Sequence, residues 1–85
     1  MFDINQFSII GKYIKMEAIN NTTYLFLEIG NDKIIKLIVT NGIKQKMLEF
    51  CSSNETIIVK GNITTNNNHD ALLQITKIMF LSSKN

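Results

Sequence analysis

The chain has 85 residues, of which 45% are hydrophobic and 19% charged, a composition that excludes an intrinsically disordered protein and leaves room for one domain. Its net charge is +2, and all nine basic residues are lysines, which excludes bidentate arginine contacts and leaves recognition of a polyanion by charge. Cys51 is the only cysteine, so no intramolecular disulfide can form. With no export signal and no apolar run long enough for a membrane span, we expect a cytoplasmic protein.

The first predicted element is a strand at residues 6–16, in which Phe7, Ile9 and Tyr13 share one face and Gly11 lies between them. A glycine inside a strand marks a bulge or a sharp coil. A long first strand that bends at this glycine can contribute to both halves of a small barrel.

Two shorter strands are predicted at residues 23–29 and 34–40, joined by a polar hairpin loop. Glu28 and Lys36 each lie on one face of their strand, and we expect these charged faces to point outward. The residues predicted to point inward are Leu25, Leu27, Ile29, Ile35, Leu37 and Val39. Those predicted to share the outer face are Tyr24, Phe26, Ile34, Ile38 and Thr40.

The hydrophobic period changes over residues 43–52, where Ile43, Met47 and either Phe50 or Cys51 recur every three to four positions. This spacing predicts one short amphipathic helix. We expect the helix to plug an open end of the sheet with its apolar face.

The last two strands are predicted at residues 56–63 and 71–80, separated by the polar loop at residues 64–70. In the first of these strands the residues predicted to point inward are Ile57, Val59 and Ile63, with Gly61 at a second bend.

The order of three strands, one helix and two strands predicts an all-β fold, the five-stranded OB-fold Greek-key barrel with one short helix between strands three and four. We expect a single OB-fold domain over residues 1–81 and a frayed C-terminal tail at residues 82–85. Such barrels bind ligands on the outer face of strands two and three, beside the loops that join strands one to two and four to five. The loop at residues 64–70 is the second of these loops.

The sequence resembles bacterial single-stranded DNA-binding proteins and their dimeric relative, primosomal replication protein B. The resemblance lies in two segments, NQFSIIGKYIK and ETIIVKGNITTNNNHDALLQITKIMFL, and rests on Asn5, Gly11, Gly61 and the spacing of the aliphatic residues. It implies an OB-fold protein that binds single-stranded DNA, or RNA, and forms a homodimer or homotetramer, with replication proteins as further partners. The chain departs from the family in having no tryptophan and no acidic C-terminal tail, which favours an accessory role.

Tyr24 and Phe26 are the candidate stacking residues, because an aromatic face on strand two can hold a base at roughly 1–3 kcal/mol per stack. The alternative is that these rings pack against a partner subunit, since Ile34 and Ile38 continue the same face.

Lys33, Lys36 and Lys60 are expected to line a groove and pair with phosphates. Lys12 and Lys15 on the first strand are weaker candidates because they have opposite parity and one of them can face a partner. The alternative for every one of these lysines is that it only keeps the surface soluble.

Asn66, Asn67 and His69 are candidate contacts on the loop, because amides donate to phosphates or base edges and an imidazole ring can stack on a base. The alternative is that asparagine is present because it suits a hairpin tip. His69 has only Cys51 as a companion for metal binding, and the four glycines form no phosphate-binding loop. We therefore expect no metal, no cofactor and no enzymatic activity.

Two functions stay open. The first is a protein that binds single-stranded nucleic acid with little sequence preference and is accessory to DNA replication, transfer or repair. The second is an OB-fold interaction module of a replication or mobile-element complex that binds protein through its outer apolar face and does not itself bind nucleic acid. A cold-shock-like RNA chaperone ranks below both, because the chain lacks the dense surface aromatics of that family.

Overall fold

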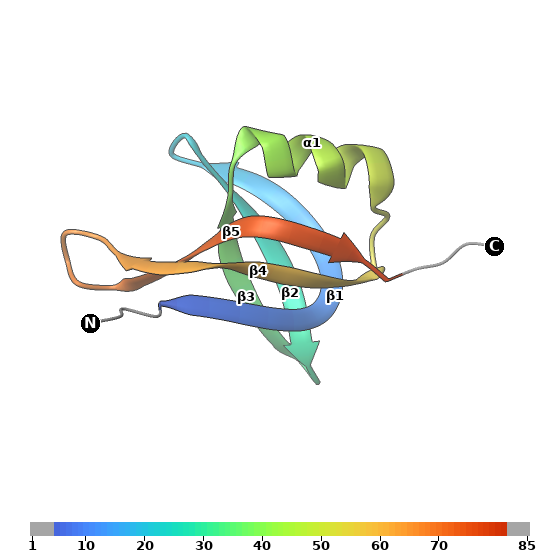
Figure 1. Cartoon of the computed structure of the whole chain (residues 1–85), viewed down its shortest axis with the longest axis horizontal. Coiled ribbons are helices and arrows are strands. Elements are labelled where there is room, and N and C mark those ends of the chain that lie inside the picture. The colour runs from blue at the N-terminus through green and yellow to red at the C-terminus, as the bar shows by residue number, and fades with distance from the viewer. Residues whose placement is uncertain (1–4, 82–85) are drawn as a thin grey trace.

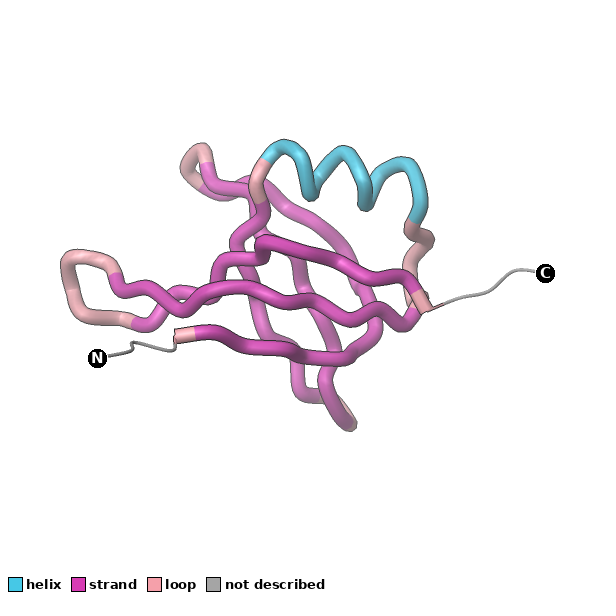
Figure 2. Tube along the Cα trace, viewed as in Figure 1, coloured by secondary structure: helices cyan, strands magenta, loops and turns pink. Residues whose placement is uncertain are grey.

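The structure is a computed structural model that describes residues 5–81, and these residues form five strands and one helix. The elements are β1 (Gln6–Ile19), β2 (Thr22–Gly30), β3 (Lys33–Val39), α1 (Asn41–Phe50), β4 (Thr56–Thr65) and β5 (Ala71–Phe80). The strands close into a barrel in the order β1-β2-β3-β5-β4 (Figure 1; Figure 2 shows the same view by element type). Neighbouring strands are antiparallel except β3 and β5, which are parallel. The predicted OB-fold barrel with its helix between β3 and β4 is confirmed.

The predicted element boundaries agree with the structure to within a few residues. β5 occupies the predicted range, whereas α1 begins and ends two residues before the predicted 43–52. The tail predicted at residues 82–85 lies outside the described residues. Within the described part of the chain, no helix is long and apolar enough to cross a membrane.

β1 is shared between the two halves of the barrel. Its first half, Gln6–Lys12, pairs with β4, and its second half pairs with β2. Gly11 lies where the strand passes from one partner to the other, and a Cβ at this position would lie 2.6 Å from the carbonyl oxygen of Glu28 and 2.8 Å from Cγ of Leu27. The strand can bend here only because the glycine leaves room for the backbone of β2.

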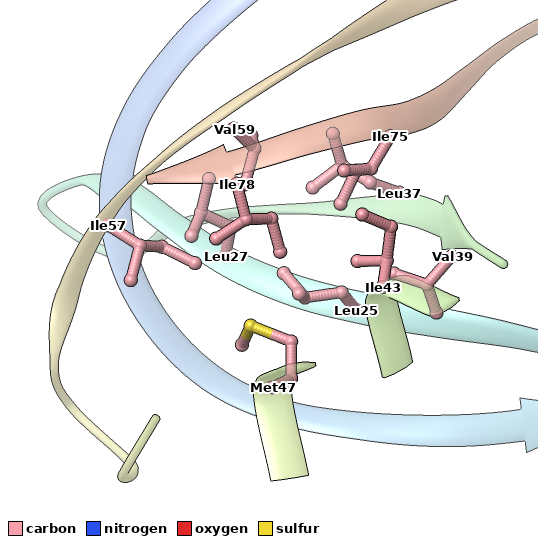
Figure 3. Packing of buried hydrophobic residues seen from close by; sticks show 10 residues of the cluster. All are labelled: Leu25, Leu27, Leu37, Val39, Ile43, Met47, Ile57, Val59, Ile75 and Ile78. Carbon is pink, nitrogen blue, oxygen red and sulfur yellow. The ribbon is translucent and has the colours of Figure 1, made fainter. Parts of the chain in front are cut away.

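The core fills the barrel with aliphatic side chains from four strands and the helix (Figure 3). Its buried members are Leu25, Leu27, Leu37, Val39, Ile43, Met47, Ile57, Val59, Ile75 and Ile78. Ile43 and Met47 reach from α1 toward the strand side chains, and the helix covers one end of the barrel as predicted. Removal of these side chains from water provides most of the favourable free energy of folding.

Three residues expected in the interior lie at its edge or outside it. Ile29 and Ile63 are 42% and 37% exposed, because Ile29 is next to the β2–β3 turn and Ile63 follows Asn62, the last β4 residue in register with β1. Figure 1 shows the β4–β5 hairpin extending beyond the barrel as a two-stranded arm. Phe50 is 62% exposed at the end of α1, and its ring centroid is 6.2 Å from that of Phe80. Cys51 follows the helix and is half-buried.

Candidate nucleic-acid interface

The outer face of β2 and β3 carries the two candidate stacking rings. Tyr24 and Phe26 alternate along β2 with Leu25 and Leu27, which are both 0% exposed, so the rings point away from the core. Both aromatic residues are half-buried. A surface of this kind presents ring faces on a rigid strand, where little side-chain entropy is lost when a flat ligand stacks on them.

A lysine ammonium group lies over each ring. Nζ of Lys36 is 4.8 Å from the centroid of Tyr24, and Nζ of Lys15 is 5.1 Å from the centroid of Phe26. Lys15 also forms a salt bridge of 3.3 Å with Glu17. Because cation–π contacts at exposed sites contribute only about 0.5–1 kcal/mol, a ligand that offers each ammonium group a negative charge can displace it from the ring.

Lys15, a weaker candidate from the sequence, lies over a ring of the β2–β3 face. A register shift between Tyr13 and Lys15 inserts a bulge into β1, and this shift places Lys15 opposite Phe26. Because the bulge interrupts the alternation of side chains along β1, the spacing of two residues between Tyr13 and Lys15 does not decide on which face Lys15 lies. The only sequence signal for this bulge is Gly11 upstream.

A groove of about 350 Å³ borders this face on the side of the β4–β5 arm. Tyr24, Lys36 and Ile38 line it from β2 and β3, and residues of the β4–β5 loop and the first residues of β5, including Leu72, line it from the arm. The groove also contains the carboxylate-bearing residue Asp70. The loop after β4 thus lies beside the β2–β3 face, where it can flank a bound strand.

Asn66 and Asp70 are the members of the loop that line this groove, and the side-chain oxygen of Asn66 is already used within the loop. It accepts hydrogen bonds from the backbone N–H groups of Asn68, at 2.8 Å, and Asp70, at 3.0 Å. His69 has a positive φ of 66°, and both it and Asn67 are exposed and lie outside the groove lining. The structure thus gives Asn66 a turn-building role, as the alternative interpretation expected.

The expectation that Lys33, Lys36 and Lys60 line one groove is wrong. In the closed barrel β5 lies between β3 and β4, and β1 lies between β2 and β4, so Lys60 on β4 is separated from the β2–β3 face. Lys33 is exposed at the β2–β3 turn, opposite Gly30. Lys12 is exposed on β1, where its register partners are Glu28 and Thr56.

Cys51 and Tyr13 have raised pKa values where the segment after α1 contacts β1. Burial, followed by the negative charge of Glu55 and a hydrogen bond to it, raises the pKa of Cys51 to about 12. Burial and then the charge of Cys51 raise the pKa of Tyr13. The thiol is therefore protonated at neutral pH and is a poor nucleophile or metal ligand. Among residues 5–81, no cluster of three His, Cys, Asp or Glu residues is placed to hold a metal ion.

Several solved structures share this architecture. Rim1, a mitochondrial single-stranded DNA binding protein from S. cerevisiae, matches with a TM-score of 0.73 and 13% identity over 98% of this chain and 99% of that chain. The SSB domain of a Synechococcus sp. protein matches with a TM-score of 0.66 and 13% identity over 93% and 98% of the two chains. A chain of the S. pombe Stn1–Ten1 complex matches 96% of this chain with a TM-score of 0.71 and 14% identity, and the match spans 62% of that longer chain.

At these identities the likeness shows the fold, an OB-fold barrel of the type found in single-stranded DNA-binding proteins. No protein-family model matches the chain, and no curated protein matches it significantly in sequence.

Proposed function

We propose that the protein binds single-stranded DNA with little sequence preference through the outer face of β2 and β3. The observation that carries this proposal is the pair of outward rings, Tyr24 and Phe26, each beneath a lysine ammonium group. The fold shared with Rim1, which is described as a single-stranded DNA binding protein, and with the Synechococcus SSB domain supports it.

The mechanism exchanges one set of contacts for another. Bases stack on Tyr24 and Phe26, which contributes roughly 1–3 kcal/mol per base, while Lys36 and Lys15 leave the rings and pair with the adjacent phosphates. Every base has a π face, and the chain has no arginine for bidentate contacts, so the mechanism gives little base specificity.

Other charged and polar residues extend this site in the proposal. Lys33 and Lys12 add positive charge at the turn end of the face, and the loop carrying Asn66, Asn67 and His69 flanks the opposite end. One copy offers only two stacking rings, so useful affinity requires several linked copies. We therefore propose a homodimer or homotetramer with an accessory role in DNA replication, transfer or repair, as in the bacterial and primosomal proteins that the sequence resembles.

Fluorescence anisotropy with labelled oligo(dT) tests the stacking role directly. Tyr24→Ala and Phe26→Ala should each weaken binding by about 5- to 150-fold, the equivalent of one lost stack of 1–3 kcal/mol. Tyr24→Phe should retain most of the affinity because it keeps the ring. Phe50→Ala is the matched control, since it removes an exposed ring at the end of α1. If the wild-type protein does not bind oligo(dT) at low salt, the proposal is wrong.

The second candidate function is protein binding through the same face. Ile34 is 54% exposed beside the rings, Ile38 continues the apolar surface, and Asp70 adds a negative charge to the adjoining groove. These features suit a protein partner better than a phosphate backbone. Two measurements separate this function from DNA binding. If the face binds protein, the wild-type protein should not bind oligo(dT), and Ile34→Asp should abolish capture of the protein partner.

A further inference from the structure

A second groove lies on the sheet formed by β1, β4 and β5. Figure 1 shows these three strands running side by side. It encloses about 490 Å³, and its lining includes Ser8, Lys60, Asn62, Thr76 and Lys77. No acidic residue is part of this lining. Phe7 and Gly61 are also part of the lining, so the groove presents ammonium, amide and hydroxyl groups beside an aromatic ring, without a carboxylate among them.

The strand register brings the two lysines together. Lys60 pairs with Lys77 across β4 and β5 and with Ser8 across β1, so the three residues form one row on the outer surface. The register then shifts, because Gly61 pairs with Ile75 and Thr76 has no partner opposite it. This bulge exposes both Thr76 and Lys77, and the hydroxyl group of Thr76 donates a hydrogen bond of 3.4 Å to the carbonyl oxygen of Lys60.

Two like charges directly opposite each other destabilise a pair of strands. Neither lysine is neutralised within the described part of the chain, where the salt bridge between Lys15 and Glu17 is the one found. An anion held between Lys60 and Lys77 would replace this repulsion with two attractions. The opposed charges of Lys60 and Lys77 therefore destabilise the free protein, and an anion bound between them removes this cost.

β5 connects this groove to the β2–β3 face. The groove beside Tyr24 ends at Leu73, and the second groove begins at Thr76, so about 10 Å of strand separates them. A chain of phosphates that leaves the first groove can reach the second by crossing β5. A phosphodiester backbone is the anion whose repeated charges fit this path.

We propose that the groove between Lys60 and Lys77 binds the phosphates of the same single strand whose bases stack on Tyr24 and Phe26. This inference rests on the proposed function. It assigns Lys60 a role on a different surface from Lys36, and it adds Lys77 as a DNA-binding residue. Each lysine neutralises one phosphate in this groove, while the rings hold the bases on the other side of the barrel.

Oligonucleotide length separates the two grooves. OB-folds bind about 4–16 nucleotides, so labelled dT5 is expected to occupy the β2–β3 face alone and dT15 to reach both grooves. For dT15, Lys60→Ala/Lys77→Ala should reduce the slope of log K against log [NaCl] by about 1.4, or 0.7 for each phosphate that is no longer neutralised. A tenfold rise in NaCl then weakens wild-type binding about 25-fold more than binding by the variant. For dT5 the two proteins should bind equally.

Lys44→Ala/Lys46→Ala is the matched control, because it removes the same charge from α1 and should leave the dT15 slope unchanged. Each single variant, Lys60→Ala or Lys77→Ala, should show about half of the effect. Circular dichroism of each variant checks that it is folded.

Three results overturn the inference, and they have different meanings. If wild-type protein binds neither oligonucleotide, the proposed function fails as well. If it binds dT15 but the double variant keeps the full slope, the second groove does not bind DNA and the first is unaffected. If the slope is kept and sedimentation shows a changed oligomer mass, Lys60 and Lys77 lie at a contact between copies of the chain.

Discussion

At the scale of single residues, the two rings and their lysines define how the β2–β3 face works. Breaking an exposed cation–π contact costs about 0.5–1 kcal/mol, whereas stacking a base contributes about 1–3 kcal/mol. In the proposed complex, the ammonium groups of Lys36 and Lys15, which lie over Tyr24 and Phe26 in the free protein, would also gain a phosphate partner. The exchange is therefore favourable, and in the free protein the lysines shield the rings from water.

Gly61 is the residue whose substitution should damage the fold most directly. A Cβ at this position would overlap the carbonyl oxygen of Gln74 on β5 and would lie 2.8 Å from Cζ of Phe7. The backbone of β5 can move away only by breaking its pairing with β4. Gly61→Ala should therefore reduce the free energy of unfolding by about 3 kcal/mol or more.

Urea denaturation followed by circular dichroism measures this change in stability. Gly42→Ala is the control, because a Cβ there meets nothing within 4 Å and the residue lies in α1. Alanine favours the helix over glycine, so the control should raise the unfolding free energy by up to about 1 kcal/mol. Equal midpoints for the two variants would contradict the steric role of Gly61.

At the scale of elements, α1 stabilises the barrel through one face only. Met47 is 1% exposed, whereas its neighbour Leu48 is 63% exposed. Met47→Ala should lower the unfolding free energy by about 2–5 kcal/mol, the cost of a cavity in the core. Leu48→Ala should change it by less than about 0.5 kcal/mol. Because α1 only covers the barrel end, folded Met47→Ala protein should bind oligo(dT) like wild type, and a reduced affinity would implicate the helix in binding.

The elements themselves can be predicted from the sequence because local signals mark them. Alternation with Leu25 and Leu27 places Tyr24 and Phe26 outside, and the change to a helical period marks α1. The pattern of a single strand does not identify its neighbours, which follow only from the order of all the elements in the barrel. The strand pattern therefore groups Lys60 with Lys36, whereas the closed barrel separates them.

Bulges are the second source of error, for a related reason. The register shifts after Tyr13 and next to Gly61 arise where β1 and β5 curve to close the barrel. Each shift changes which side chains face outward from that point along the strand. Lys15 and Lys77 both owe their positions to such shifts, and neither stands out by its sequence pattern.

At the scale of the whole molecule, the net charge of +2 hides an uneven arrangement of lysines. Two lie over the rings of the β2–β3 face, and two face each other on the β1–β4–β5 sheet. The barrel lies between these two pairs of lysines, and the structure measures 44 × 32 × 28 Å along its principal axes. A strand that contacts both surfaces must follow the barrel around β5 rather than lie along one face.

This arrangement predicts that the salt dependence of DNA binding by the wild-type protein increases in one step, between oligonucleotides that contact one surface and longer ones that contact both. For dT5, the contacts of Lys15 and Lys36 should give a slope of about −1.4 for log K against log [NaCl], because each phosphate contact contributes about −0.7. For dT15, the further contacts of Lys60 and Lys77 should bring the slope to about −2.8. Anisotropy titrations at several NaCl concentrations measure both values, with protein concentrations kept below the range where the oligomer mass changes. Equal slopes for the two lengths would mean that the strand stays on the β2–β3 face, because no additional ammonium group would then meet a phosphate.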